Sequence, residues 1–265
     1  MSRTGLRRTG ACLAVLALLA GSCARPPRPG GALESTAERY AVARDHREAL
    51  LAALSGEWTV RADGRGTGRL PTLPALIDLA APDRARLRVS ALVGTALDVL
   101  VTRDSLYAWI PSQKLAFAAA GEELGVGAPA AFAGRVLAAT WSPPHEAWRA
   151  ATAESASWRL RWREGGDTLS LRVGADGRPA EAWLGHGAIG VRVRYTQWMA
   201  LKGESFPQRC ELADDSSWVR VRLDALDVKA PDHADDGWFT PRHASGWRTM
   251  TWDDLRAMIA RRELP

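Results

Sequence analysis

A chain of 265 residues can bury a complete hydrophobic core, and a single all-β domain of this length is ordinary. Its formal charge of +5 comes from 35 Lys and Arg against 30 Asp and Glu; three of the arginines lie in the first 22 residues, which leaves 32 basic against 30 acidic residues in the remainder. This near-balance argues against a nucleic-acid-binding protein, despite the basic isoelectric point.

Residues 1–22 have the form of an export signal peptide. Three arginines precede an apolar stretch over Ala11–Ala20. About ten apolar residues are too few to span a bilayer, which needs about 20. The small residues directly before Cys23 resemble a bacterial lipobox, which implies that Cys23 is lipidated and becomes the new N-terminus. Ordinary signal cleavage near Ala20, with Cys23 incidental, is the alternative.

Residues 23–32 are rich in Pro and Gly and predict a tether between the anchor and a domain over 33–265. The first element of that domain is expected to be a helix. It begins at a Ser-x-x-Glu capping box at Ser35 and runs to about Leu54, with Gly56 placed to end it.

The segment from Arg84 to Ala118 alternates apolar and polar residues with period 2 and is broken at 93–95 and 102–105. Alternation bounded by turn residues predicts short antiparallel strands with one buried face. The apolar positions that share a face are Leu87, Val89 and Ala91, then Leu97, Val99 and Val101, then Leu106, Ala108 and Ile110. Such a meander needs another element to cover its apolar face.

The second half of the chain returns to strands after an interruption. An apolar, Ala-rich stretch over 122–140 predicts one or two short helices, and Asp176-Gly177 predicts a hairpin turn later on. A short amphipathic C-terminal helix is expected over 251–264, with Thr251 as its cap. The apolar strand positions include Trp158, Leu160, Trp162, Leu169, Leu171, Val173, Val191, Val193, Val219, Val221 and Leu223.

These elements define a mainly β (α+β) fold class. We expect a single curled antiparallel sheet of about ten strands, because one sheet that long must curl. The helices are then expected to cover its concave side.

The sequence offers no constellation typical of an enzyme, and we expect neither a metal nor another cofactor. The five His are scattered, and the best metal candidate, Asp232-His233 with Asp235 and Asp236, is better explained as a polar loop. If Cys12 is removed with the signal and Cys23 is acylated, Cys210 has no disulfide partner. We expect Cys210 to be a small buried residue rather than a nucleophile.

The lipobox, the helix that leads into Gly56–Val60, and the meander with its turn at Leu92-Val93-Gly94 resemble the bacterial lipoprotein carriers and receptors of the LolA/LolB-like family. The resemblance covers most of 33–243. It implies an unclosed β-barrel wrapped over helices, with an apolar cavity that takes acyl chains. It also implies that Leu92 and Val93 form the hydrophobic loop with which receptor members hand lipoproteins to the membrane.

We therefore expect a non-enzymatic outer-membrane lipoprotein, lipid-anchored and facing the periplasm, that binds acyl chains, lipoproteins or phospholipid. Ala24, rather than Asp, after Cys23 fits outer-membrane retention by the sorting preference of enteric bacteria. The alternative is a structural or regulatory module of the cell envelope that docks a partner protein. The cavity residues are expected to be Leu87, Val89, Leu97, Val99, Val101, Leu106, Ala108, Ile110, Trp158, Leu160, Trp162, Val191 and Val193.

Overall fold

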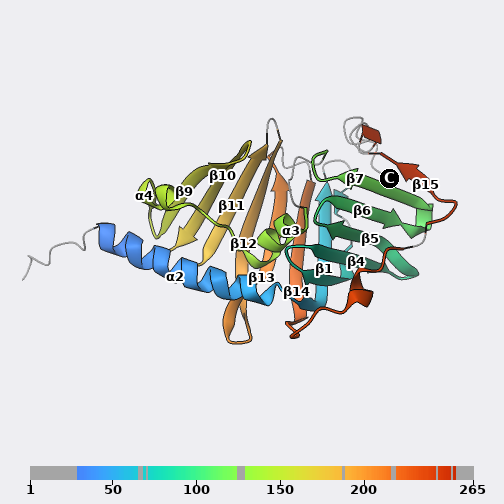
Figure 1. Ribbon diagram of the computed structural model, residues 1–265, viewed down its shortest axis with the longest axis horizontal. Helices are drawn as coiled ribbons and strands as arrows, with labels where there is room; N and C mark the ends of the chain where they lie inside the picture. The colour runs from blue at the N-terminus through green and yellow to red at the C-terminus, as the bar shows by residue number, and fades with distance from the viewer. Residues whose placement is uncertain are drawn as a thin grey trace, which may run out of the picture.

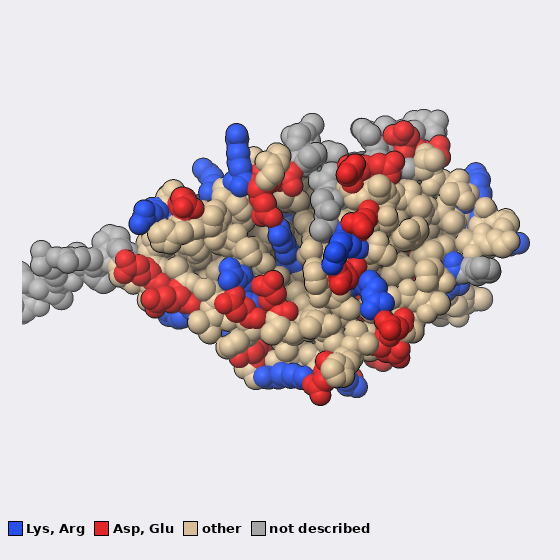
Figure 2. All heavy atoms as spheres, viewed as in Figure 1, with Lys and Arg blue, Asp and Glu red and all other residues tan. Residues whose placement is uncertain are grey.

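The computed structural model describes residues 29–64, 68–69, 71–123, 129–186, 189–215, 219–242, 244–251 and 253–254. One large β-sheet takes strands from every described range except 253–254, with helices against it (Figure 1). Basic and acidic side chains are interspersed over the face that Figure 2 shows. The expected signal peptide, Cys23 and almost all of the expected C-terminal helix lie outside the described residues.

The first half of the chain builds one side of the sheet from the middle outwards. Strand β1 (Leu54–Gly64) lies in the middle, and the strands from β3 to β7 follow one another as antiparallel neighbours, which is the expected meander. The strands are β3 (Leu73–Ala80), β4 (Arg84–Ala91), β5 (Gly94–Thr102), β6 (Ser105–Ile110) and β7 (Leu115–Ala120), with β2 (Gly68–Arg69) paired to β1.

The second half builds the other side from the far edge inwards. It starts at β8 and ends at β14, which pairs with β1 and so joins the halves. The strands are β8 (Thr152–Glu154), β9 (Ser157–Glu164), β10 (Asp167–Gly174), β11 (Pro179–His186), β12 (Ile189–Leu201), β13 (Glu204–Asp214) and β14 (Val219–Lys229). The predicted turn at Asp176-Gly177 connects β10 to β11, with Gly177 at φ 81°.

The expectation of about ten strands in a purely antiparallel sheet was wrong. The sheet has fifteen strands within the described residues, and it is mixed because β15 (Arg248–Met250) pairs in parallel with β7. Strands β2, β8 and β15 escaped detection because two or three residues are too few to establish an alternating pattern. The sheet is not closed, and β15 and β8 lie at its two ends.

The long connection from β7 to β8 carries the predicted helical insert. It contains α3 (Pro129–Ala138) and α4 (His145–Arg149) and runs from β7, next to the end strand β15, to β8 at the other end of the sheet. In Figure 1 these helices lie against the sheet together with α2 (Pro29–Leu50). Helix α2 contacts β10 and β13, α3 contacts β4, β5 and β13, and α4 contacts β9.

Helix α2 begins six residues before the predicted capping box and ends four residues before the predicted end. Ser35 therefore lies inside the helix, where its hydroxyl donates to the Ala32 carbonyl (3.2 Å) instead of capping. Gly56 does not end the helix but belongs to β1. A Cβ at Gly56 would lie 2.6 Å from the Asp227 carbonyl oxygen of β14, so the glycine permits close approach of the two strands.

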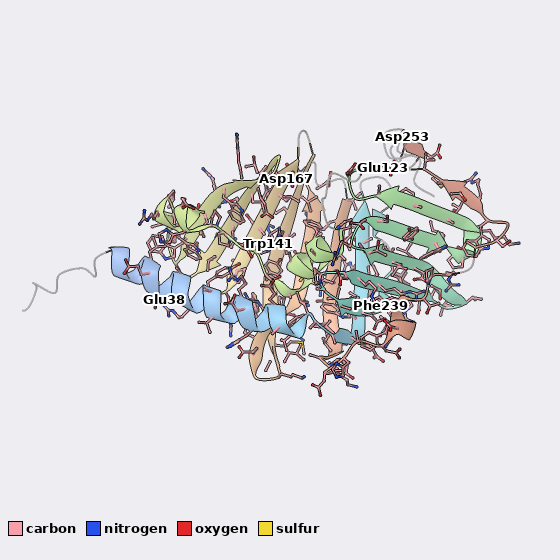
Figure 3. The ribbon with its side chains drawn as sticks, viewed as in Figure 1. Glu38, Glu123, Trp141, Asp167, Phe239 and Asp253 are labelled. Atoms are coloured by element: carbon pink, nitrogen blue, oxygen red, sulfur yellow. The ribbon has the colours of Figure 1, made fainter. Side chains whose placement is uncertain are left out.

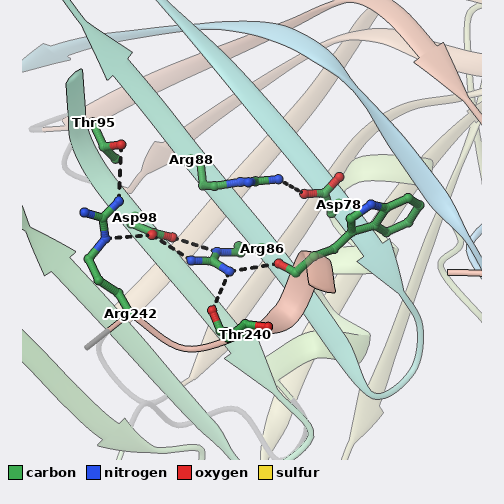
Figure 4. Close-up of polar contacts among 8 residues, drawn as sticks. Asp78, Arg86, Arg88, Thr95, Asp98, Thr240 and Arg242 are labelled. Atoms are coloured by element: carbon green, nitrogen blue, oxygen red, sulfur yellow. Dashed lines mark hydrogen bonds and ion pairs between the residues drawn. The ribbon is translucent and has the colours of Figure 1, made fainter. Parts of the chain in front are cut away.

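The segment that follows β14 runs to β15 across the face of the sheet opposite to the one that the helices contact. It includes η2 (Asp236–Phe239), and Phe239 packs with Leu100 and Trp109 in a second small apolar cluster. Beside this segment, Arg86 donates to both carboxylate oxygens of Asp98 (2.9 and 2.8 Å), which raises the pKa of Arg86 (Figure 4).

Arg86 also donates to two backbone carbonyls of this C-terminal crossing, those of Trp238 (2.9 Å) and Thr240 (2.7 Å). Arg242 adds a bond to Asp98 (3.2 Å). The buried ion pair therefore fastens the crossing to β4 and β5.

Candidate functional site

One face of the sheet is apolar from edge to edge. Residues directly opposite on neighbouring strands lie on the same face, and apolar residues pair in this way across nearly every strand. The thirteen expected cavity residues all belong to this face, and their pairs include Leu87–Val99, Val89–Leu97, Val99–Ala108, Val101–Leu106, Trp162–Leu169, Leu160–Leu171 and Val191–Leu184. Period-2 alternation therefore assigned the correct side chains to one surface.

An apolar pocket of about 340 Å³ lies between this face and α3. Four of the expected residues, Leu87, Val99, Val101 and Leu106, line it. The further apolar residues of its wall are Ile77 and Ala85 from β3 and β4, Leu212 and Leu223 from β13 and β14, and Pro129, Phe132, Ala133, Val136 and Leu137 from α3 and its start.

The other nine expected residues do not line the pocket. Val89, Leu160 and Val193 are buried in the main core, and Leu97, Trp162 and Val191 pack against it. Ala108, Ile110 and Trp158 are partly buried. Helices α2 and α4 contact β9, β10 and β13, and so lie over the part of the face that carries Trp158, Leu160 and Trp162.

The residues of α3 were missed as pocket residues. The only signal in the sequence was that an apolar, Ala-rich insert must pack against another element. The position of that insert depends on the crossing from β7 to β8, which local patterns do not encode.

The C-terminal end of α3 is held by buried side chains. The Tyr195 hydroxyl of β12 donates to the Val136 carbonyl (2.9 Å) and accepts a hydrogen bond from Trp141 Nε1 (2.9 Å). Cys210 Sγ of β13 lies 3.9 Å from the carbonyl oxygens of Val136 and Leu137. These donors satisfy carbonyls that a helix end leaves without intrahelical partners.

Helix α2 fixes the residues that follow α3. The Tyr40 hydroxyl donates to the Trp141 carbonyl, and Arg47 NH2 donates to the Ala139 carbonyl (3.2 Å). Figure 3 shows Trp141 over the middle of the sheet, next to α2. Helix α3 thus covers the pocket, and its C-terminal end and the residues after it are hydrogen-bonded to the sheet and to α2.

Burial sets the protonation of these groups. It raises the pKa of Tyr40, Tyr195 and Cys210 above their ordinary values and lowers that of Arg47. The Cys210 thiol is therefore protonated, in keeping with its expected role as a small buried residue. The guanidinium of Arg47 lies 5.5 Å from the ring centroid of Trp198, and its Nε and NH1 find no hydrogen-bond partner among the described residues.

The β4–β5 turn projects two large apolar side chains into solvent. Leu92 is 106% exposed and Val93 is 96% exposed. Leu92 and Val93 are neighbours in sequence, whereas the other exposed large apolar residues among the described positions, Val42, Tyr107 and Leu226, stand apart from one another in the chain.

The acidic loop around His233 uses its carboxylates elsewhere. Asp232 pairs with Lys202, Asp236 pairs with Arg84, and Asp235 accepts a hydrogen bond from the Gly237 amide. No cluster of three His, Cys, Asp or Glu suited to a metal ion occurs in the described part of the chain. No helix in the described ranges is both long enough and apolar enough to cross a membrane.

Comparison with known proteins identifies the fold through structure alone. No protein-family model matches the chain, and no curated protein matches its sequence. A crystal structure of a LolA superfamily protein from Nitrosomonas europaea matches with a TM-score of 0.50 at 16% identity, over 71% of this chain and 90% of that chain. A domain named for outer membrane lipoprotein sorting, from Vibrio parahaemolyticus, matches with a TM-score of 0.48 at 9% identity, over 75% and 95% of the two chains. The chain has a LolA/LolB-like fold.

Proposed function

We propose that this protein is a non-enzymatic lipoprotein of the outer membrane that faces the periplasm and binds an acyl chain in the pocket beneath α3. The pocket is the observation that carries the proposal. Its volume of about 340 Å³ lies at the lower end of the range for ligand sites, roughly 300–1,000 Å³. Its wall is almost wholly apolar side chains, which suits one hydrocarbon chain.

The energetics favour a hydrocarbon ligand. Each buried methylene contributes about 0.8 kcal/mol, so several carbons of a chain bind without any placed polar group. A sugar or a peptide would bring polar groups into a space that offers few hydrogen-bond partners, at a cost of about 1–3 kcal/mol for each unsatisfied group. The ligand classes that carry a suitable chain are acylated lipoproteins and phospholipids.

In this proposal, the helices cover the concave side of an unclosed barrel. Contacts of α3 support this arrangement, because the helix contacts β4 and β5 on one side and β13 on the other, although β3, β1 and β14 separate these strands in the sheet. A sheet that curls around α3 would form the walls of the acyl site, with α3 as its roof.

Filling the pocket tests the acyl site. Ala133→Phe would place a ring in the space between α3 and the sheet, whereas Ala131→Phe changes a residue of α3 that does not line the pocket. Native mass spectrometry of the purified protein, followed by organic extraction, should find bound fatty acid or phospholipid in the wild type and in Ala131→Phe, and none in Ala133→Phe.

Two outcomes would count against the acyl site. A clean apo mass for the wild type, unchanged after incubation with an acylated peptide, would favour the alternative of a protein-docking module. Equal lipid occupancy in both variants, with unchanged melting temperatures, would show that the lipid binds outside this pocket.

Leu92 and Val93 are proposed to enter the membrane when the ligand is handed over. Burial of a Leu or Val side chain contributes about 1.5–3 kcal/mol, so the pair contributes about 3 kcal/mol or more, roughly a hundredfold in partitioning. Leu92→Glu with Val93→Glu should abolish flotation of the Cys23→Ala protein with liposomes. Leu226→Glu, which changes another exposed leucine on β14, is the matched control and should float like its parent.

The anchor is tested separately. If Cys23 is lipidated, mass spectrometry of the wild type finds an acylated N-terminal cysteine, and Cys23→Ala protein that also carries Leu92→Glu and Val93→Glu leaves the membrane fraction of cells. A wild-type protein whose Cys23 carries no acyl group would contradict the anchor but not the acyl pocket.

A further inference from the structure

Trp183 lies flat on the polar face of the sheet, opposite the face that carries the acyl pocket. Its indole occupies the space above two glycines, Gly185 and Gly190, which are directly paired on β11 and β12. A Cβ at Gly185 would lie 2.2 Å from the Trp183 ring, and one at Gly190 would lie 2.9 Å from its Nε1. A side chain at either position would occupy the space of the indole, so only glycine allows the ring to lie against the backbone here.

A hydrogen bond fixes the orientation of this ring. Trp183 Nε1 donates to Asp215 Oδ1 (2.8 Å), and a Cβ at Gly190 would also collide with that carboxylate. One surface of the indole covers the glycines, and Trp183 is only half-buried, so the other surface is available to a ligand.

Hydroxyl and guanidinium groups surround the ring. Ser170 is directly opposite Trp183 on β10, and Thr168 is directly opposite Gly185. Arg192 is the opposite neighbour of Trp183 on β12, and Arg161 is the opposite neighbour of Ser170 on β9. Together with Trp183, Arg159, Leu169 and Glu181, these side chains line a pocket of about 250 Å³.

The two arginines differ from those in the adjacent row. Arg159 pairs with Glu154, and Arg172 and Arg194 both pair with Glu181, so each arginine of that row has a carboxylate partner. Arg161 and Arg192, by contrast, have no ion pair or side-chain hydrogen bond within the described part of the chain. Aromatic cover of a strand glycine explains why Trp183 lies flat, but it does not explain why two arginines without an ion pair lie beside the ring.

We propose that this platform binds a saccharide ring that carries a phosphate or a carboxylate. The C–H face of a sugar ring packs on the exposed surface of an indole, because the aromatic face is electron-rich. Arg161 and Arg192 bind the anionic substituent through charge-assisted hydrogen bonds, which planar guanidinium groups form well with phosphate and carboxylate. Ser170 and Thr168 supply hydroxyls for those of the sugar. The site is independent of the acyl pocket, which lies on the other face.

Calorimetric titration of the purified protein with glucose 1-phosphate, glucose and inorganic phosphate tests the site. Glucose 1-phosphate is expected to bind more tightly than either half. Arg192→Gln should weaken binding about tenfold or more, as expected for loss of a hydrogen bond to a charged group. Trp183→Leu should do the same while retaining the melting temperature to within a few degrees.

Arg149→Gln is the matched control, because Arg149 is an exposed arginine at the end of α4, a helix that packs on β9. Its affinity should equal that of the wild type. If glucose 1-phosphate binds no better than inorganic phosphate, or if Arg192→Gln binds like the wild type, the inference is overturned.

Vesicles distinguish the two sources of the sugar. Phosphatidylcholine vesicles are compared with and without a glycolipid whose headgroup is a phosphorylated glucosamine, and with phosphatidylglycerol vesicles of equal charge. Glycolipid-specific binding that Arg192→Gln removes supports a membrane-borne saccharide, and binding of the soluble sugar alone supports a free one. Equal binding to phosphatidylglycerol and glycolipid vesicles would reduce the effect to charge attraction and contradict a saccharide site.

Discussion

Removal of the Asp98 carboxylate is expected to destabilise the protein strongly. The side chain of Asp98 is 0% exposed and that of Arg86 is 8% exposed, and the carboxylate accepts two hydrogen bonds from Arg86 and one from Arg242. Asp98→Ala would leave the Arg86 charge buried without its counter-ion. Breaking a buried ion pair from one side costs about 3–5 kcal/mol, which lowers the melting temperature of a chain of this size by about 6 °C or more.

Thermal and urea unfolding measure the effect, and trypsin cleavage of the native protein at Arg242 and Arg248 measures whether the C-terminal crossing loosens. Asp83→Ala is the matched control, because Asp83 pairs with Arg103 in an ion pair whose side chains are 52% and 66% exposed, and it should cost less than about 1 kcal/mol.

Combining Arg86→Met with Asp98→Leu separates charge from packing. Replacing a buried pair by apolar residues is often neutral, so the double variant should be more stable than Asp98→Ala. An Asp98→Ala protein within about 1 kcal/mol of the wild type would refute the view that this ion pair fastens the C-terminal crossing.

Two further predictions concern the joints of the sheet. Gly56→Ala should lower the free energy of unfolding by about 1–3 kcal/mol in urea, because its Cβ would meet backbone atoms of β14 at 2.6 and 2.7 Å. The control Gly166→Ala should be nearly neutral, because a Cβ there would have no atom within 4 Å. Equal effects of the two substitutions would contradict the close approach of β1 and β14. Burial raises the pKa of Asp224, but hydrogen bonds from Arg222 and Arg209 outweigh it and hold the pKa below its ordinary value of about 3.9. The stability that Asp224 contributes is thus present above about pH 4 and is lost as the pH falls through the lower folded pKa. The melting temperature of Asp224→Asn should therefore lie below that of the wild type at pH 7 and converge with it near pH 2; a constant difference would refute this linkage.

Much of the candidate site was predictable because alternation is local. Leu87, Val99, Val101 and Leu106 share a face by the geometry of an extended chain, whatever strand lies beside them. The turn at Leu92-Val93 was equally visible, since a turn between two alternating runs follows from the same pattern. Their full exposure was not, because exposure depends on what packs nearby.

Other expectations, which were based on local sequence patterns, were wrong. Ser35 and Glu38 have the form of a capping box, yet α2 continues through them to Pro29. Gly56 has the form of a helix stop, yet the backbone of β14, about 170 residues later in the chain, is what requires a glycine there. The position of the Trp183 ring against the backbone depends in the same way on the pairing of Gly185 with Gly190.

The sequence by itself determined which side chains belong to the apolar face, where the meander turns, and that an apolar helical insert would need cover. The tertiary structure alone decided that β1 pairs with β14, that the crossing from β7 to β8 lays α3 over four of the predicted residues, and that the crossing from β14 to β15 closes on Arg86 and Asp98. The physical reason is one of range. Side-chain alternation is set by the geometry of one strand, whereas the partner of a strand and the element that covers its face are set by the free energy of contacts between segments far apart in the chain.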